Sequence, residues 1–287
     1  MGLGRNVLFR VATSRRLERA VKRVPGGERA AWRSASPYVA SRTRSGAIAT
    51  VETLLERGHG VSIDLFGERV SEAAVADTVL EDYLALVAAL PPPPADVWLS
   101  VDLSHLAVGA GAAAATDRLA AIADALPAGR RVQVGAEEAA VTDRVLDAVL
   151  AAAGAPVDAT VQANLRRAPA DAQRLAAAGI PVRLVKGAYV EADALPWGAE
   201  TDAAYARIAL LLGAAGAALR LATHDDALHR PLLPALPAAD CELLLGVRPD
   251  RAAALRAAGR RVRVYVPFGP DWFRYFMRRR AEAQGAA

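Results

Sequence analysis

Two cations, a glycine and a tyrosine lie at the end of one short apolar run. The segment reads Arg183-Leu184-Val185-Lys186-Gly187-Ala188-Tyr189. The guanidinium of Arg183 offers a forked set of donors to an electron-rich acceptor, and Gly187 lets the backbone approach a ligand closely. An ion pair between Arg183 and a carboxylate such as Glu137 is an equally good interpretation from the spacing alone. The segment is therefore a candidate anion or cofactor site.

A second group of polar residues lies on the helix predicted over residues 272–283. Tyr275, Arg278, Arg279 and Glu282 are three or four residues apart, so they share one face of that helix. Adjacent arginines suit a carboxylate, which accepts bidentate pairs. A basic surface helix is the simpler interpretation of this pattern when it is taken alone, and a helix lying over the mouth of a barrel is the functional one.

Other common catalytic patterns are weak in this sequence. The four histidines show no metal-ligand spacing, so we predict no metal site. Only His224 follows a predicted strand, and we expect His59 and His229 to lie on the surface. The sequence has neither a nucleophile elbow nor a phosphate-binding glycine loop, which disfavours acyl and phosphoryl transfer.

Short β-rich runs alternate with alanine-rich stretches from residue 58 onward. The predicted strands are 61–65, 97–103, 132–134, 160–162, 182–185, 219–223, 242–245 and 262–266. The predicted helices are 72–90, 114–126, 139–153, 170–178, 202–215, 225–236, 250–258 and 272–283. Ser71 and Thr201 are the expected N-caps of their helices, and Gly179 and Gly259 the expected C-terminal glycines.

Repeated strand–helix units predict parallel strands joined by crossover helices. Eight units favour an α/β fold of the closed (βα)8 barrel type over an open doubly wound sheet. The open sheet needs a glycine-rich fingerprint after its first strand, and Asp64-Leu65-Phe66-Gly67-Glu68 is not one. We therefore predict a barrel catalytic domain over residues 58–287.

Residues 1–57 form a predicted helical extension, with helices at about 5–23 and 47–57 around a polar loop. We expect it to cover either the lower end or the mouth of the barrel. Its first 44 residues are rich in arginine, a composition that suits nucleic acid or anionic lipid. A solvated helix face is the simpler interpretation, because few aromatic residues are available for base stacking.

The composition fits one cytoplasmic domain. The 287 residues suffice for a barrel, 53% are hydrophobic, and 35 basic against 31 acidic residues give a net charge of +4. The single cysteine, Cys241, excludes a disulfide framework and is expected to be buried. No apolar run reaches the length of about 18 residues that a membrane span needs, and we see no secretory signal.

In a barrel of this type the active site lies at the C-terminal ends of the strands. Polar residues follow nearly every predicted strand, which a barrel built only for stability has little need for. These candidates are Asp64, Glu68, Asp102, Ser104, Glu137, Glu138, Gln162, Asn164, Arg183, Lys186, Tyr189, Thr223, His224, Asp225, Arg248 and Tyr265.

These segments resemble the proline dehydrogenase family. Its patterns are a strand-five Arg-Leu-Val-Lys-Gly-Ala-Tyr, matched by 183–189, and a terminal Tyr-x-Pro-x-Gly…Tyr-x-x-Arg-Arg…Glu. The second is matched by Tyr265, Pro267, Gly269, Tyr275, Arg278, Arg279 and Glu282. Shorter matches are Val161-Gln162-Ala163, Ala222-Thr223-His224, Leu244-Leu245-Gly246 and 64–68, so the resemblance covers nearly the whole barrel.

The resemblance implies a non-covalent FAD, oxidation of L-proline to Δ1-pyrroline-5-carboxylate, and electron delivery to a membrane quinone. It implies that Arg183 lies at the flavin N5 as a catalytic residue. FAD would also contact Ala136, Gln162, Lys186, Gly187, Ala188, Thr223 and His224. Arg278 and Arg279 would bind the substrate carboxylate, and Tyr265, Tyr275, Tyr189 and Leu184 would wall the proline ring.

The implied partners are a quinone and a separate pyrroline-5-carboxylate dehydrogenase, without nucleic acid. Together with the basic N-terminal segment, a quinone acceptor leads us to expect a cytoplasmic chain with peripheral contact at the inner face of the membrane.

Two positions depart from the family pattern. The family usually has Lys where this chain has Asp102, and Asp where it has Gly135. In one explanation, Asp102 takes over the work of the missing strand-three carboxylate and is itself catalytic. In the other, the substrate is a different cyclic or N-substituted amino acid. A flavin-free barrel that binds an amino acid or anion is a further alternative.

Overall fold

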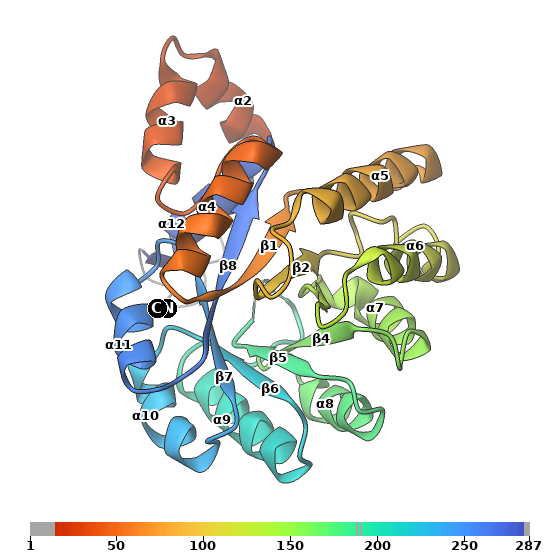
Figure 1. The fold of residues 1–287 in the computed structure, drawn as a ribbon, viewed down its shortest axis with the longest axis vertical. Coiled ribbons are helices and arrows are strands. Elements are labelled where there is room, and N and C mark those ends of the chain that lie inside the picture. Colours follow the sequence, from red (N-terminus) through yellow and green to blue (C-terminus); the bar gives the residue numbers. More distant parts are fainter. Residues whose placement is uncertain (1–14, 188, 190, 284–287) are drawn as a thin grey trace.

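The computed structural model describes residues 15–187, 189 and 191–283, and the strands among them close into a parallel barrel (Figure 1). Each strand pairs in parallel with the next, and β8 pairs with β1 from Gly60 and Arg263 to Leu65 and Phe268. The strands are β1 (Gly60–Leu65), β2 (Val97–Val101), β3 (Val132–Val134), β4 (Val157–Gln162), β5 (Val182–Val185), β6 (Leu219–Ala222), β7 (Asp240–Leu244) and β8 (Val262–Phe268). The predicted (βα)8 architecture is confirmed.

Helices surround the barrel and precede it (Figure 1). The preceding helices are α2 (Arg15–Arg23), α3 (Gly27–Ala35) and α4 (Arg44–Glu56). The remaining helices are α5 (Ala73–Ala89), α6 (Ala112–Ala125), the short 3-10 helix η1 (Ala139–Val141), α7 (Thr142–Ala151), α8 (Ala168–Ala177), α9 (Ala199–Ala214), α10 (Asp226–Ala235), α11 (Pro249–Ala257) and α12 (Trp272–Ala283).

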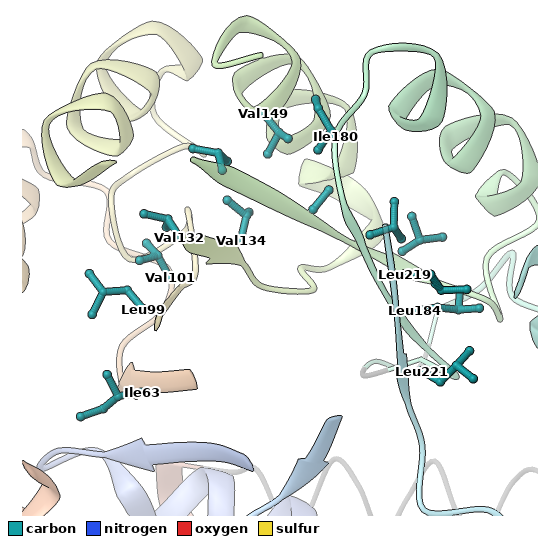
Figure 2. Close-up of a cluster of buried hydrophobic side chains, with 14 of the residues drawn as sticks. Ile63, Leu99, Val101, Val132, Val134, Val149, Ile180, Leu184, Leu219 and Leu221 are labelled. Atoms are coloured by element: carbon teal, nitrogen blue, oxygen red, sulfur yellow. The ribbon is translucent and has the colours of Figure 1, made fainter. Parts of the chain in front are cut away.

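Aliphatic side chains on the outer face of the strands pack against the helices. Figure 2 shows Val132 of β3 below Val149 of α7, with Leu99 of β2 and Ile63 of β1 farther along the row of strands. All four are fully buried, so water is excluded from the contact between barrel and helices. Because side chains alternate along a strand, the intervening residues face the interior of the barrel.

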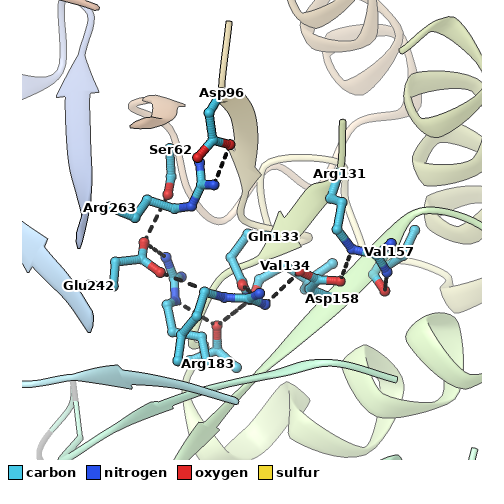
Figure 3. Close-up of polar contacts among 12 residues, drawn as sticks. Ser62, Asp96, Arg131, Gln133, Val134, Val157, Asp158, Arg183, Glu242 and Arg263 are labelled. Carbon is cyan, nitrogen blue, oxygen red and sulfur yellow. Dashed lines mark hydrogen bonds and ion pairs between the residues drawn. The ribbon is translucent and has the colours of Figure 1, made fainter. Parts of the chain in front are cut away.

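The barrel interior is polar, unlike the aliphatic layers that usually fill such barrels. Inside it, ion pairs join strands that are separated by one strand: Arg220 of β6 pairs with Asp158 of β4 at 2.5 Å, and Arg183 of β5 with Glu242 of β7 at 3.1 Å (Figure 3). The guanidinium of Arg263 lies 3.5 Å from the centroid of the Trp98 ring. Buried charges are tolerated only when they are paired, and these arginines and carboxylates pair with one another.

Several local predictions differ from the structure. α3 occupies part of the predicted polar loop, and residues 5–14 lie outside the described part of the chain. Ser71 is not an N-cap, because Glu72 takes that position before α5. Thr201 lies inside α9, where its hydroxyl donates to the Pro196 carbonyl at 2.9 Å. The first turn of the predicted helix 139–153 is the 3-10 helix η1.

The predictions for the C-terminal glycines and for Cys241 are confirmed, and one of the two predictions for surface histidines is wrong. Gly179 and Gly259 follow α8 and α11 with positive φ angles, as C-terminal glycines do. Cys241 is buried. His59 is half-buried, and the expectation for His229 is wrong, because its ring is fully buried with Nδ1 facing Arg251 at 3.3 Å.

The N-terminal helices pack on α12 through a second hydrophobic core. Trp32 of α3 meets Trp272 of α12 edge-on at 5.1 Å between ring centroids, and the Arg42 guanidinium lies 4.5 Å from the Trp32 centroid. The Ala40 N–H donates to the carbonyl of Pro267 at the end of β8. The extension is thus attached at the C-terminal end of the barrel, and the domain boundary at residue 57 stays a prediction.

Candidate active site

A cavity of about 830 Å³ opens at the C-terminal ends of the strands. Its walls come from the ends of β2 to β8 and from α12, as the strand-end rule predicts. Most of the residues singled out from the sequence line it. They are Asp102, Ala136, Arg183, Lys186, Gly187, Tyr189, Thr223, His224, Tyr265, Tyr275, Arg278 and Arg279.

Three of the residues that the resemblance assigns to FAD or the substrate are not among the described lining residues. Leu184 is fully buried in the core between barrel and helices, because its neighbour Arg183 faces the interior. Its expected place in the substrate wall is therefore wrong. Gln162 is buried beside the cavity, where its amide donates to the Glu137 carbonyl at 2.7 Å. Ala188 lies outside the described residues.

The cavity also contains residues that the sequence prediction missed. Tyr38 comes from the segment between α3 and α4, and Trp197 from the segment between β5 and α9. No local pattern around either residue marks it. Glu242 of β7 also lines the cavity, and a charged residue within an apolar strand was the available signal.

Arg183 is held from two sides at the floor of the cavity. Its Nε donates to the Thr160 hydroxyl at 3.1 Å, and one terminal nitrogen donates to Glu242 at 3.1 Å. Burial lowers the pKa of Arg183, but the charge and hydrogen bond of Glu242 more than offset it, so the net pKa is raised. Arg183 thus forms an ion pair, as the alternative interpretation of the sequence expected, but its partner is Glu242 and not Glu137. Glu137 instead accepts the Ser104 N–H at 2.7 Å.

The two arginines of α12 face the same cavity among tyrosine rings. The Arg278 guanidinium lies 5.7 Å from the Tyr189 centroid and 6.0 Å from that of Tyr275. The Arg279 guanidinium lies 5.2 Å from the Tyr275 centroid. These distances are in the range of cation–π contacts. The C-terminal helix therefore covers the barrel mouth and is not a separate basic surface.

Buried carboxyl groups accumulate near these cations. Burial and the charge of Asp102 raise the pKa of Asp64 well above its usual value, and the Tyr265 hydroxyl donates to Asp64 Oδ2. Burial raises the pKa of Asp102 to about 6, against the opposing charges of Arg278 and Arg183. Burial and Asp102 raise the pKa of Glu137 to about 8. The raised pKa values therefore favour the protonated form at Asp64 and Glu137, which lie beside the cavity, more than at Asp102, which lines it.

Asp102 and Gly135, the two positions that depart from the family pattern, are neighbours in the structure. A Cβ atom added at Gly135 would overlap Oδ1 of Asp102. The Asp102 carboxylate thus occupies the space into which a side chain at position 135 would begin. A larger residue at 135 would require the Asp102 side chain to leave its present position.

We expect Gly135→Ala to lower the free energy of unfolding by about 1–3 kcal/mol, as overpacking does. In an Asp102→Ala background, the same change should cost much less, because the overlapping carboxylate is gone. Urea unfolding of the two single variants and the double variant measures this coupling. Strict additivity, within about 0.5 kcal/mol, would contradict the steric link.

Some polar groups at the ends of β5 and β6 already bind other side chains or the backbone of the protein. Lys186 Nζ lies 2.6 Å from both Asp202 and Asp225, so it bridges two carboxylates. At Gly187 an added Cβ would overlap the Asn164 side chain, and this neighbour explains why glycine is needed there. Burial and the charge of Arg279 lower the pKa of His224 to about 4. Its neutral ring accepts the Leu244 N–H through Nε2 at 3.1 Å.

The proline dehydrogenase family profile matches residues 47–287 of this chain. The chain belongs to the proline dehydrogenase family. Proline dehydrogenase 1 of Bacillus subtilis (strain 168) is 32% identical over 257 residues, which cover 85% of each chain. The proline dehydrogenase of Deinococcus radiodurans is 30% identical over 268 residues, covering 88% of this chain and 86% of that one. As a member of this family, the protein is an oxidoreductase of proline catabolism.

Solved structures show the same fold. Proline utilization A of Bdellovibrio bacteriovorus superposes with a TM-score of 0.80 at 19% identity, over 96% of this chain and 36% of that longer one. At this identity the likeness concerns the fold alone. Within the described residues, no helix is both long and apolar enough to cross a membrane.

Proposed function

We propose that this enzyme uses FAD to oxidise L-proline to Δ1-pyrroline-5-carboxylate and passes the electrons to a quinone. One observation carries the proposal: Arg183 and the pair Arg278 and Arg279 line the same cavity, from its floor and from its cover. A cation beside a flavin and a second cationic pair for a carboxylate are two requirements of this reaction. The names of the relatives support proline as the substrate.

The described residues fit a flavin. The cavity volume is within the range of cofactor sites. His224 Nδ1 and Asn164 Oδ1 are buried without a hydrogen-bond partner among the described residues, and both are available to a polar ligand. In this proposal the residues that hold FAD are Ala136, Arg183, Lys186, Gly187, Thr223 and His224. Gln162, buried beside the cavity, supports them. Ala188, which lies outside the described residues, is also proposed to contact FAD.

When bound, FAD would accept the hydride that leaves carbon 5 of proline. The protein supplies orientation and charge. Arg278 and Arg279 bind the substrate carboxylate in a bidentate manner, and Tyr189, Tyr265 and Tyr275 exclude water and align the ring. Arg183 stabilises the negative charge that develops on the cofactor.

Asp102 accepts the proton of the substrate amine in this proposal. The amine of proline is cationic at neutral pH and must become neutral before it can release a hydride from the adjacent carbon. Asp102 lines the cavity, and its carboxylate fills the space at Gly135. The N–H bond of the ammonium group breaks and an O–H bond forms on Asp102, which then returns its proton to solvent.

We expect kcat/KM for L-proline to rise with pH through about 6, where Asp102 loses its proton. Asp102→Asn should remove this limb of the profile and lower the plateau. Asp117→Asn, on the exposed face of α6, is the matched control and should leave the profile unchanged. A limb near 6 that persists in Asp102→Asn would assign it to another group.

The test of the proposed function is an anaerobic titration of the FAD-loaded protein with L-proline. We expect the visible flavin band to bleach and one equivalent of cyclic imine product to form. A colourless protein that takes up no added FAD would favour a flavin-free amino-acid or anion-binding barrel. A flavin that bleaches with another cyclic or N-substituted amino acid, and not with L-proline, would favour the alternative substrate.

The partner proposals have separate tests. Reoxidation of the reduced enzyme by a short-chain quinone, faster than by oxygen, supports the quinone acceptor. Transfer of the product to a separate pyrroline-5-carboxylate dehydrogenase would complete the pathway. The membrane proposal is tested separately. Binding to anionic vesicles at low salt would support peripheral contact at the inner face of the membrane through the basic helices α2 and α3. Failure to bind these vesicles would contradict the proposal. Salt-dependent retention on nucleic acid would contradict the assignment of the basic helices to a membrane.

A further inference from the structure

We propose that Glu242 is a positioning residue, which fixes the guanidinium of Arg183 beneath the cavity and limits the positive charge that it offers to a flavin. This role rests on the proposed function, since Arg183 is there assigned to the cofactor. Glu242 lies beside Arg183 in the polar interior of the barrel (Figure 3), where both residues reach the floor of the cavity.

The Glu242 carboxylate is anchored by strands on both sides of the barrel. Its Oε1 accepts the Ser62 hydroxyl of β1 at 2.9 Å and the Arg183 guanidinium of β5 at 3.1 Å. Its Oε2 lies 3.9 Å from Arg220 Nε of β6. The contacts with Ser62 of β1 and Arg220 of β6 restrict the position of the carboxylate, and the carboxylate in turn holds the Arg183 guanidinium.

The charges around Glu242 keep it ionised. Burial raises its pKa, but Arg183, Arg220 and Arg263 face it and bring the net pKa below the usual value. Asp158 takes up part of the Arg220 charge at 2.5 Å, and Asp96 pairs with Arg263 at 2.5 Å. Among the described residues, Glu242 is the carboxylate in ion-pair contact with Arg183. It therefore offsets the charge of the guanidinium at the floor of the cavity.

Two effects on a bound flavin follow from this arrangement. The fixed guanidinium keeps its position without reorganisation when negative charge develops above it, which is how preorganised groups contribute to catalysis. The partial neutralisation by Glu242 also reduces the attraction of the site for that negative charge. Removing the carboxylate charge while keeping its shape should separate the two effects.

Glu242→Gln is the variant that removes the charge and keeps the shape. An amide oxygen still accepts from Ser62 and Arg183, so Arg183 stays in place but is more strongly positive. Sulfite, which forms an anionic adduct at flavin N5, is a probe of this charge that is independent of proline turnover. We expect the sulfite dissociation constant of the FAD-loaded variant to fall about tenfold, and the flavin reduction potential to rise, because a charge a few ångströms away is only partly screened.

Asp240→Asn in the same strand is the matched control. Asp240 pairs with the exposed Arg261 at 2.6 Å, outside the cavity, and its loss should leave sulfite affinity unchanged. Equal sulfite affinities and potentials in wild type and Glu242→Gln would overturn the proposal and leave Glu242 as a packing residue of the barrel.

Ser62→Ala provides a second test that keeps the charge. It frees the carboxylate from β1, so Arg183 should lose its fixed position, and kcat for L-proline should fall several-fold while KM is unchanged. Unchanged kcat would contradict the positioning role even if Glu242→Gln did not fold. A wild-type protein that forms the sulfite adduct but is not reduced by L-proline would fail the proposed function and leave the role of Glu242 intact. A wild type without flavin would end both.

Discussion

Replacing Arg279 with methionine should lower kcat/KM for L-proline by about two to four orders of magnitude. The loss of one partner from a buried ion pair costs about 3–5 kcal/mol, because the remaining charge is desolvated and unpaired. In the proposed complex that remaining charge is the substrate carboxylate under α12. Arg278→Met should have a similar effect, since its guanidinium faces the same tyrosine-lined cavity.

We expect most of this loss to appear in KM. The carboxylate is bound equally in the ground state and in the transition state, and loss of such uniform binding raises KM more than it lowers kcat. Arg279→Lys should be intermediate, because lysine restores the charge without the bidentate geometry. Arg261→Met, which removes an arginine that is 79% exposed, is the control and should have wild-type kinetics. Wild-type KM in Arg279→Met would show that the carboxylate binds elsewhere.

Replacing Arg220 with methionine should lower the free energy of unfolding by about 3–5 kcal/mol. Arg220 is buried and pairs at 2.5 Å with Asp158, whose side chain is fully buried inside the barrel. It also donates to the Gln133 side chain at 2.9 Å. Without Arg220, the buried Asp158 charge keeps one partner, Arg131, at 2.5 Å. Urea unfolding followed by circular dichroism measures the change.

Arg131→Met is the matched comparison for this prediction. It removes the other partner of the same carboxylate, but the Arg131 side chain is 30% exposed, so water replaces part of the interaction and the loss should be smaller. The double variant Asp158→Leu with Arg220→Met should recover much of the stability, because a buried pair is often replaced by apolar residues at little cost. A single Arg220→Met variant within about 1 kcal/mol of wild type would show that the interior charges do not hold the barrel together.

The sequence was sufficient for the barrel because its periodic signals are strong. Apolar runs separated by alanine-rich stretches defined the strands, and α12 has the bounds predicted for it. The strand-end rule then brought Asp102, Arg183, His224 and Tyr265 to one cavity. Parallel strands fix which end each residue occupies, so a local pattern was enough to predict a long-range arrangement.

The errors arise where the outcome depends on partners distant in the chain. Leu184 was placed in the site from its motif, although strand alternation next to an inward Arg183 directs it to the helices. Tyr38 enters the cavity because the segment after α3 runs along the end of β8, which no local pattern indicates. Glu242 was missed as the partner of Arg183, since β6 separates β5 from β7 and their side chains meet only inside the closed barrel.

A crystal structure with FAD and a cyclic carboxylic acid whose ring oxygen replaces the amine nitrogen is the most direct test of the central claim. We predict the isoalloxazine over the strand ends with N5 facing Arg183, and the carboxylate of the ligand between Arg278 and Arg279. A flavin bound outside this cavity, or a ligand carboxylate away from both arginines of α12, would contradict it.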